Sequence, residues 1–339
     1  MTRVERLTGV AADWDPFVRN QPSWTPFHLL AWRDVIGQVF GHPTIYLAAR
    51  DGLDLVGVLP LVLVKSIPFG RLLVSMPFVN YGGPLGSAEA IRALAAEATA
   101  IARAERVKLL ELRSRVELPL DLPVSHRKIT VVLDIPAGEP ERLFKSFESK
   151  LRSQVRRPQK EGIEVRFGRD QLDAFYSVFA RHMRDLGTPV QPKKLFTALA
   201  DAFAEDLWVG AAWYQGRPVA AGVGFRWGTE FEMTWASSLY AFNKLSPNMA
   251  LYWAFMERAC NAGLTLFNFG RCSEGVGTHR FKKQWGSRDE QLWWYHEGHG
   301  AMGTPSPDDG AYSWGPRLWK HLPVGVANLI GPPIVAGIP

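Results

Sequence analysis

The chain has 339 residues, of which 47% are hydrophobic and 21% charged, a balance typical of a folded globular protein with room for two domains. Its formal net charge of +6 favours anionic partners and does not choose among phosphorylated molecules, nucleic acid and acidic membranes. Cys260 and Cys272 are its only cysteines, so a disulfide framework and a zinc site built from cysteines are excluded.

The first half of the chain predicts strands around one long helix. Apolar runs flank an Asp51-Gly52 turn, which is typical of a β-hairpin. Ser87 is a suitable N-cap for the alanine-rich run that follows it. The expected elements are strands at 44–49, 55–64, 72–76 and 107–112 and a helix at 88–106.

The second half predicts two helices, a three-stranded meander, and then a further helix and strand. Ser246 and Pro247 favour the start of the last helix, and Gly263 favours its end. The expected elements are helices at 172–185, 195–203 and 247–261 and strands at 208–214, 219–227, 230–236 and 265–269. Strands, then a helix, then a strand recur in both halves, so the sequence predicts an α+β protein of two related mixed-sheet domains.

A basic segment lies between the two halves. From Lys150 to Lys160 it contains five cations and no acid. Arg152 and Arg156 are four residues apart and share one helix face, where they suit a phosphate or a nucleic acid. The alternative is an ordinary solvated helix face. Pro158 is expected to interrupt this helix, because it lacks a backbone donor and disfavours helical geometry at the residue before it.

The segment 267–286 combines four glycines with four cations among aromatic side chains. Glycine lets the backbone approach a ligand closely, and fixed cations hold phosphate or stabilise an oxyanion. The segment therefore predicts a functional loop, the alternative being a connector whose aromatic side chains belong to the core. It matches neither a Walker loop nor a Gly-x-Gly-x-x-Gly fingerprint, which argues against nucleotide triphosphate hydrolysis.

Three further features are less specific. His296, Glu297 and His299 lack the helical setting and the third ligand of a metal site, so no metal is expected. The segment 182–189 is typical of the C-terminal end of a helix. Residues 322–339 have no charge but seven prolines and glycines, which favours a packed irregular tail over a spanning helix, with peripheral membrane contact as the alternative. Because the N-terminus lacks an apolar signal core, we expect a cytoplasmic protein, possible membrane association being left open.

Five segments, taken together and in order along the chain, resemble the FemAB-like transferases, which are acetyltransferase-like (GNAT-fold) proteins. The likeness is to the branch associated with bacterial exosortase and exopolysaccharide systems. The segments are Tyr-Gly-Gly-Pro at 81–84, and 151–162, 183–189, 245–249 and 269–286. The resemblance implies two tandem GNAT-like (acyl-CoA N-acyltransferase fold) domains at 1–135 and 136–300, the second with the transfer site, and a Pro/Gly-rich packed tail at 301–339.

The resemblance also implies N-acyl transfer, in which an aminoacyl or other acyl group passes to an amine of a cell-envelope or exopolysaccharide-related acceptor without a covalent intermediate. Phe281 and Lys282 match the Phe-Lys pair at the transfer site of the relatives, where the lysine stabilises the tetrahedral oxyanion. Asp185 and Glu274 are the candidate bases, and the alternative is that the substrate itself takes the proton. The residues expected to bind substrate are Tyr81, Arg152, Arg156, Arg271, Gly275, Gly277, Arg280 and Trp285.

The acyl donor is left between two classes. In the relatives it is aminoacyl-tRNA, so tRNA is an expected partner beside a small-molecule or lipid-linked acceptor. An acyl-coenzyme A or acyl carrier protein is the alternative, although Arg271 precedes Gly275 and Gly277 by one residue too many for the usual coenzyme A motif. A second alternative is a non-catalytic module that binds RNA or polysaccharide through the basic segment.

Overall fold

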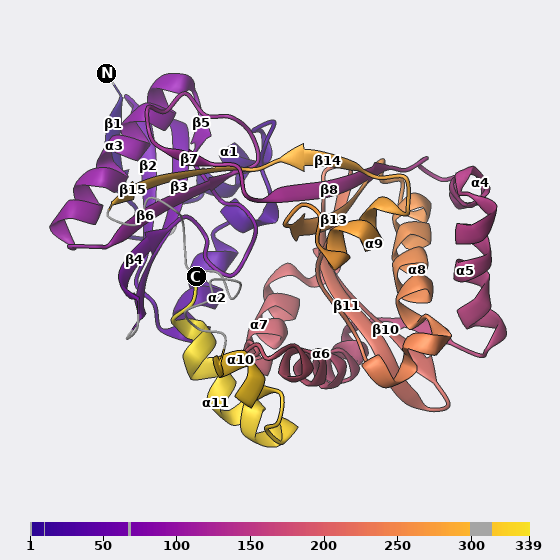
Figure 1. Ribbon diagram of the computed structural model, residues 1–339. Coiled ribbons are helices and arrows are strands. Elements are labelled where there is room, and N and C mark those ends of the chain that lie inside the picture. Colours follow the sequence, from indigo (N-terminus) through magenta and orange to yellow (C-terminus); the bar gives the residue numbers. More distant parts are fainter. Residues whose placement is uncertain (1, 10, 67–68, 299–313) are drawn as a thin grey trace. The chain divides into compact units, whose positions relative to one another are not determined.

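The computed structural model describes residues 2–9, 11–66, 69–298 and 314–339, and the chain divides into two compact units (Figure 1). The first unit comprises Met1–Lys128, Gln291–Asp309 and Pro333–Pro339, and the second comprises Ile129–Glu290 and Gly310–Pro332. Each unit holds one mixed sheet, so the expected α+β fold with two mixed-sheet domains is confirmed.

The sheet of the first unit is covered by a helix rich in alanine. Its strands are β1 (Arg3–Arg6), β2 (Thr44–Asp51), β3 (Asp54–Ser66), β4 (Gly70–Val74), β5 (Leu85–Gly86), β6 (Leu109–Ser114), β7 (Val124–Ser125) and β15 (Trp293–Gly298). The order is β1-β2-β3-β4-β6-β15-β7, with β5 on β3, and only β4 and β6 pair in parallel among the described pairings of this sheet. The helices are α1 (Trp14–Arg19), α2 (Ala31–Phe40) and α3 (Ala88–Ala104), and Ser87 caps α3 by accepting from the Ala90 N–H, as predicted.

The sheet of the second unit carries helices on both faces. Its strands are β8 (Ile129–Asp134), β9 (Glu164–Phe167), β10 (Leu207–Tyr214), β11 (Arg217–Trp227), β12 (Glu230–Ser238), β13 (Leu266–Cys272) and β14 (Arg288–Gln291). The order is β14-β8-β13-β12-β11-β10-β9. The helices are α4 (Pro140–Ser146), α5 (Ser149–Lys160), α6 (Leu172–Leu186), α7 (Lys193–Phe203), α8 (Pro247–Asn261) and α9 (Gly277–Lys283). The expected domain boundaries were at residues 135 and 300, which would put β8 in the first domain and β15 in the second. Instead, β8 belongs to the sheet of the second unit and β15 to the sheet of the first.

Two irregularities in the second sheet open it at one end. The parallel ladder between β12 and β13 contains three residue pairs, the last being Glu232 with Asn268. Beyond that point β12 pairs with β11, while β13 pairs with β8, so the two parallel strands separate. The register between β11 and β12 also shifts, which leaves Thr234 as the extra residue of a β-bulge.

The bulge changes which face the later residues of β12 occupy. Phe231, before the bulge, stacks on Phe255 of α8 at 5.3 Å between ring centroids. Trp235, after it, meets Phe196 of α7 at 5.2 Å. Strict alternation would place the side chains of residues 231 and 235 on the same face of the sheet. The one extra residue instead places the side chain of Trp235 on the opposite face, toward α6 and α7.

Two expectations about proline were wrong. Helix α5 continues through Pro158 to Lys160, because Pro158 is buried on the same apolar face as Leu151 and Val155, and this packing offsets the lost backbone hydrogen bond. The tail, expected to be irregular, forms α10 (Trp314–Trp319) and α11 (Val324–Ala336); residues 301–313 lie outside the described ranges. None of the helices in those ranges is long and apolar enough to cross a membrane.

Candidate functional site

The glycine- and cation-rich segment forms a strand and a helix instead of the expected loop. β13 runs to Cys272, and α9 begins at Gly277 after a turn in which Gly275 has a φ of +77°. This turn folds α9 back on β13. The Nζ atom of Lys282 thereby donates hydrogen bonds to the carbonyl oxygens of Gly270 at 2.6 Å and Arg271 at 3.0 Å.

Lys282 is a buried cation. Its residue is 6% exposed, and burial lowers its pKa from 10.5 to about 8, an effect that Cys272 and Glu232 oppose and Arg271 reinforces. At neutral pH the ammonium is therefore still charged, in surroundings that screen it poorly. A cation of this kind stabilises developing negative charge more strongly than an exposed lysine does.

Buried polar side chains fix the point where β12 and β13 separate. Asn268 Nδ2 donates to Glu230 Oε1 at 2.8 Å, and its Oδ1 accepts from the Thr130 hydroxyl at 2.7 Å. The same Oδ1 accepts from the Gly270 backbone N–H at 2.8 Å. Buried polar groups are costly unless they are paired, so this network holds one arrangement. It positions Gly270, whose carbonyl oxygen in turn holds Lys282.

Aromatic side chains support α9 from the core. The Phe281 ring lies 4.9 Å from that of Tyr252 and 6.4 Å from that of Trp285. Trp285 is 1% exposed and packs on Phe147 at 5.5 Å. Trp285 was expected to bind substrate, but its side chain has almost no surface that a substrate could contact. Phe281, in contrast, is only partly buried.

A histidine that the sequence interpretation did not select lies at the same end of the second sheet. His182 Nδ1, on α6, is 2.9 Å from the Ser237 hydroxyl on β12. Burial lowers the pKa of His182, and Asp185 opposes this effect. The Asp185 carboxylate forms an ion pair with Arg184 at 2.9 Å. The β-bulge brings Ser237 to the α6 face, and nothing in the local spacing of residues 182–189 revealed that partner.

The two arginines of the basic segment have structural partners. Arg152 Nη1 donates to the carbonyl oxygens of Phe147 at 2.6 Å and Lys145 at 3.2 Å, at the end of α4. The Arg156 guanidinium lies over the Phe144 ring at 5.0 Å. These contacts tie α5 to α4.

The other predicted residues are spread more widely. Four of them, Arg271, Gly275, Gly277 and Arg280, are exposed at the end of β13, on the turn that follows it and on α9. They are within eleven residues of Lys282 in the sequence. Tyr81 belongs to the first unit, where it is 1% exposed, with its ring 5.8 Å from that of Phe27 and below the Arg115 guanidinium at 5.9 Å.

Near the end of β15, the described histidine and its neighbour each pair with a charged or titratable side chain. His296 Nε2 lies 2.9 Å from Glu111 Oε2, whereas Glu297 pairs with Arg103 at 2.9 Å. His299 lies outside the described residues. Within the described ranges, no group of three histidine, cysteine or carboxylate side chains is placed to hold a metal ion.

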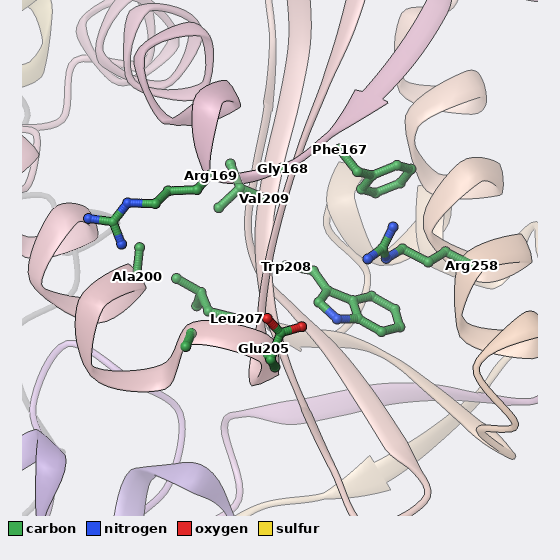
Figure 2. A pocket seen from close by; sticks show the side chains of 10 residues that line it. Phe167, Gly168, Arg169, Ala200, Glu205, Leu207, Trp208, Val209 and Arg258 are labelled. Carbon is green, nitrogen blue, oxygen red and sulfur yellow. The ribbon is translucent and has the colours of Figure 1, made fainter.

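A cavity of about 290 Å³ lies at the start of β10, and none of the predicted site residues lines it (Figure 2). The Arg258 guanidinium of α8 lies there over the rings of Trp208 at 4.7 Å and Phe167 at 4.9 Å. Because Arg258 is near the C-terminal end of α8, this cavity is at the end of the helix opposite to Pro247.

Known proteins resemble the chain in domain sequence and in fold. The model of a family described as an acetyltransferase (GNAT) domain matches residues 145–283. Similar solved structures include FemX, with a TM-score of 0.64 and 18% identity, covering 86% of this chain and 97% of that one. L-PGS from Bacillus licheniformis has a TM-score of 0.58 and 12% identity, covering 94% and 96%.

A tandem GNAT protein from the clavulanic acid biosynthesis pathway has a TM-score of 0.50 and 12% identity, covering 90% of this chain and 100% of that one. No curated protein matches the sequence. The expected type of enzyme, an acyltransferase on a GNAT fold, is confirmed by the domain match. Residues 145–283 thus match an acetyltransferase (GNAT) domain, in a chain that shares the fold of FemX and of the tandem GNAT protein.

Proposed function

We propose that the protein transfers an aminoacyl or other acyl group to an amine of a cell-envelope or exopolysaccharide-related acceptor, by direct attack in a ternary complex. The observation that carries the proposal is the buried Lys282 ammonium within the GNAT domain, held against the end of β13 where that strand has left β12. The resemblance of the five sequence segments to FemAB-like transferases supports an acceptor of the cell envelope by analogy.

Lys282 suits the stabilisation of an oxyanion. An ammonium group has three hydrogen-bond donors, and the carbonyl oxygens of Gly270 and Arg271 accept two of them. We assign the third to the carbonyl oxygen of the donor as it becomes an oxyanion. The acceptor nitrogen forms a bond to that carbonyl carbon, the bond to the leaving oxygen or sulfur breaks, and the leaving group takes up a proton.

His182 is our choice for the group that removes the proton from the attacking amine. A lowered pKa keeps its imidazole neutral at pH 7, as a base must be. Asp185, the base expected from the sequence, is engaged by Arg184 and is better suited to orienting His182. Glu274 is exposed on the turn before α9 and remains the other candidate.

An acyl-coenzyme A donor is the alternative, and the match of residues 145–283 to an acetyltransferase domain favours it. The two donors can be separated by calorimetry with coenzyme A and with charged tRNA. They can also be separated by following transfer of a radiolabelled acyl group from each donor to amino sugars and to aminoacylated or amine-bearing lipid precursors.

The test of the site uses two neighbouring lysines of α9. Lys282→Met should lower transfer by about 100- to 1,000-fold, the usual effect of removing one oxyanion donor. Lys283→Met is the matched control, because Lys283 lies outward and pairs with Asp289 at 3.3 Å. Equal activity in the two variants would remove Lys282 from the chemistry. The non-catalytic alternative would be supported by two results together: no transfer from either donor, and salt-dependent RNA binding of equal strength for aminoacylated and uncharged tRNA.

A further inference from the structure

The last helix presents four of its large aliphatic side chains to solvent, whereas Val335 near its end is buried. On α11, Val326 is 42% exposed, Leu329 76%, Ile330 39% and Ile334 44%. Leu329 and Ile330 follow Val326 by three and four residues, and Ile334 follows Ile330 by four, so the four lie on one side of the helix. The buried positions of α11 include the small Ala327, which is 1% exposed.

This distribution is the reverse of that in an ordinary surface helix. A helix packed on a globular protein usually buries its large apolar residues and exposes polar ones. Here the small Ala327 and Gly331 face inward, and a β-carbon on Gly331 would come within 3.0 Å of the Val190 backbone. Close packing against the second unit thus uses the small face, and the aliphatic face is left outward. Contiguous exposed apolar patches of this kind mark sites of association.

Positive charge accompanies the aliphatic face. Residues 314–339 contain Arg317 and Lys320 and no acidic residue, and both cations are exposed on the segment that leads into α11. Leu318, 64% exposed, lies between them. Aliphatic side chains beside a basic flank complement an anionic bilayer, whose phosphates attract the cations while the side chains enter the acyl boundary.

We propose that α11 and the end of α10 bind the surface of a membrane rich in anionic phospholipid. α11 has 13 residues and is about 20 Å long, shorter than the roughly 30 Å hydrocarbon core, so it would lie in the interface and not cross it. A second copy of the chain fits less well, since a symmetric contact would bring two basic flanks together.

The experiment is sedimentation of the full chain with vesicles of phosphatidylcholine, alone or with about 30% phosphatidylglycerol, at low and high salt. The wild type should bind the anionic vesicles, less tightly at high salt. Leu329→Ser combined with Ile330→Ser should weaken binding at least tenfold, since burying even one such side chain is worth about that factor. Leu53→Ser is the matched control, because Leu53 is 93% exposed at a turn elsewhere in the chain.

Melting temperatures of all variants establish that the fold is intact, and both substitutions are at exposed positions, where small effects are expected. Absence of wild-type binding, or equal binding by the double variant, would overturn the proposal. So would a concentration-dependent dimer in size-exclusion chromatography that the double variant abolishes while vesicles stay unbound, since the face would then belong to a second copy. A variant with Arg317→Gln and Lys320→Gln should lose the salt dependence.

Discussion

Lys282 should make a measurable contribution to the pH dependence of the free energy of unfolding. In the folded chain its pKa is lowered from 10.5 to about 8, because the ammonium is buried. A depression of this size corresponds to about 3 kcal/mol. Below pH 8 the folded state thus holds a proton on Lys282 at a cost of about 3 kcal/mol relative to the unfolded chain.

The sign follows from which state binds the proton. Between pH 8 and 10.5 the lysine of the unfolded chain is still protonated, whereas the folded one is becoming neutral. The unfolded state then binds more protons, so the free energy of unfolding rises with pH across this window. Lys282→Met abolishes this contribution. The difference in unfolding free energy, wild type minus variant, should therefore increase by about 3 kcal/mol from pH 8 to pH 10.5.

The assay is urea denaturation of the wild type and Lys282→Met at several pH values, with Lys283→Met as the control for losing a lysine. Stability at one pH is not decisive, because Lys282→Met removes a buried charge and also leaves the carbonyl oxygens of Gly270 and Arg271 without that donor, at about 1–3 kcal/mol each. A difference that stays flat from pH 7.5 to 10.5 would refute the buried-cation assignment.

Three other predictions follow from the same contacts. The rate of transfer should fall above about pH 8 as Lys282 loses its proton, and should fall on the acid side only below pH 6.5, where His182 becomes protonated; a pH-rate profile checks both limbs. Arg152→Gln should destabilise the fold by about 1–3 kcal/mol in thermal unfolding through its two lost carbonyl partners, and Arg156→Gln by about 0.5–1 kcal/mol. Glu111→Gln should cost about 3–5 kcal/mol, because it leaves the buried Arg113 guanidinium without its carboxylate partner, and circular dichroism melts would measure the loss.

Most regular elements could be predicted because their signals are local. The cap at Ser87, Pro247 at the first position of α8 and Gly187 at the end of α6 are each decided within a few residues, and the structure has a helix end at all three. The predictions for the proline-containing segments were wrong because the deciding contacts are not local. Whether a helix survives a proline depends on what its face buries, and that is decided by the rest of the unit.

The candidate site divides in the same way. Lys282 could be selected from its motif, but its burial and its bonds to Gly270 and Arg271 depend on α9 folding back along β13. His182 and Ser237 meet only because one extra residue in β12 turns Ser237 toward α6. A β-bulge has no clear signature in one sequence, since its cause is the register of two strands.

The two units have the same opening in their sheets but fill it differently. In the first unit β4 and β6 also form a parallel ladder of three pairs, which ends at Val74 with Glu111. There Glu111 is bound by Arg113 at 2.7 Å and by His296 at 2.9 Å, and although burial opposes it, these two partners lower the pKa of Glu111 to about 2.

In that cluster of the first unit the Glu111 carboxylate and the Arg113 guanidinium neutralise each other, and the three side chains are at most 4% exposed. At the matching point of the second unit, the cation at the opening is Lys282, whose hydrogen bonds go to two carbonyl oxygens and whose charge is favoured by the nearby Glu232. Closed ion pairs stabilise an arrangement, whereas a buried cation hydrogen-bonded to carbonyl oxygens is suited to a charge that arrives during a reaction. This contrast supports our proposal that the chemistry lies in the second unit, at Lys282.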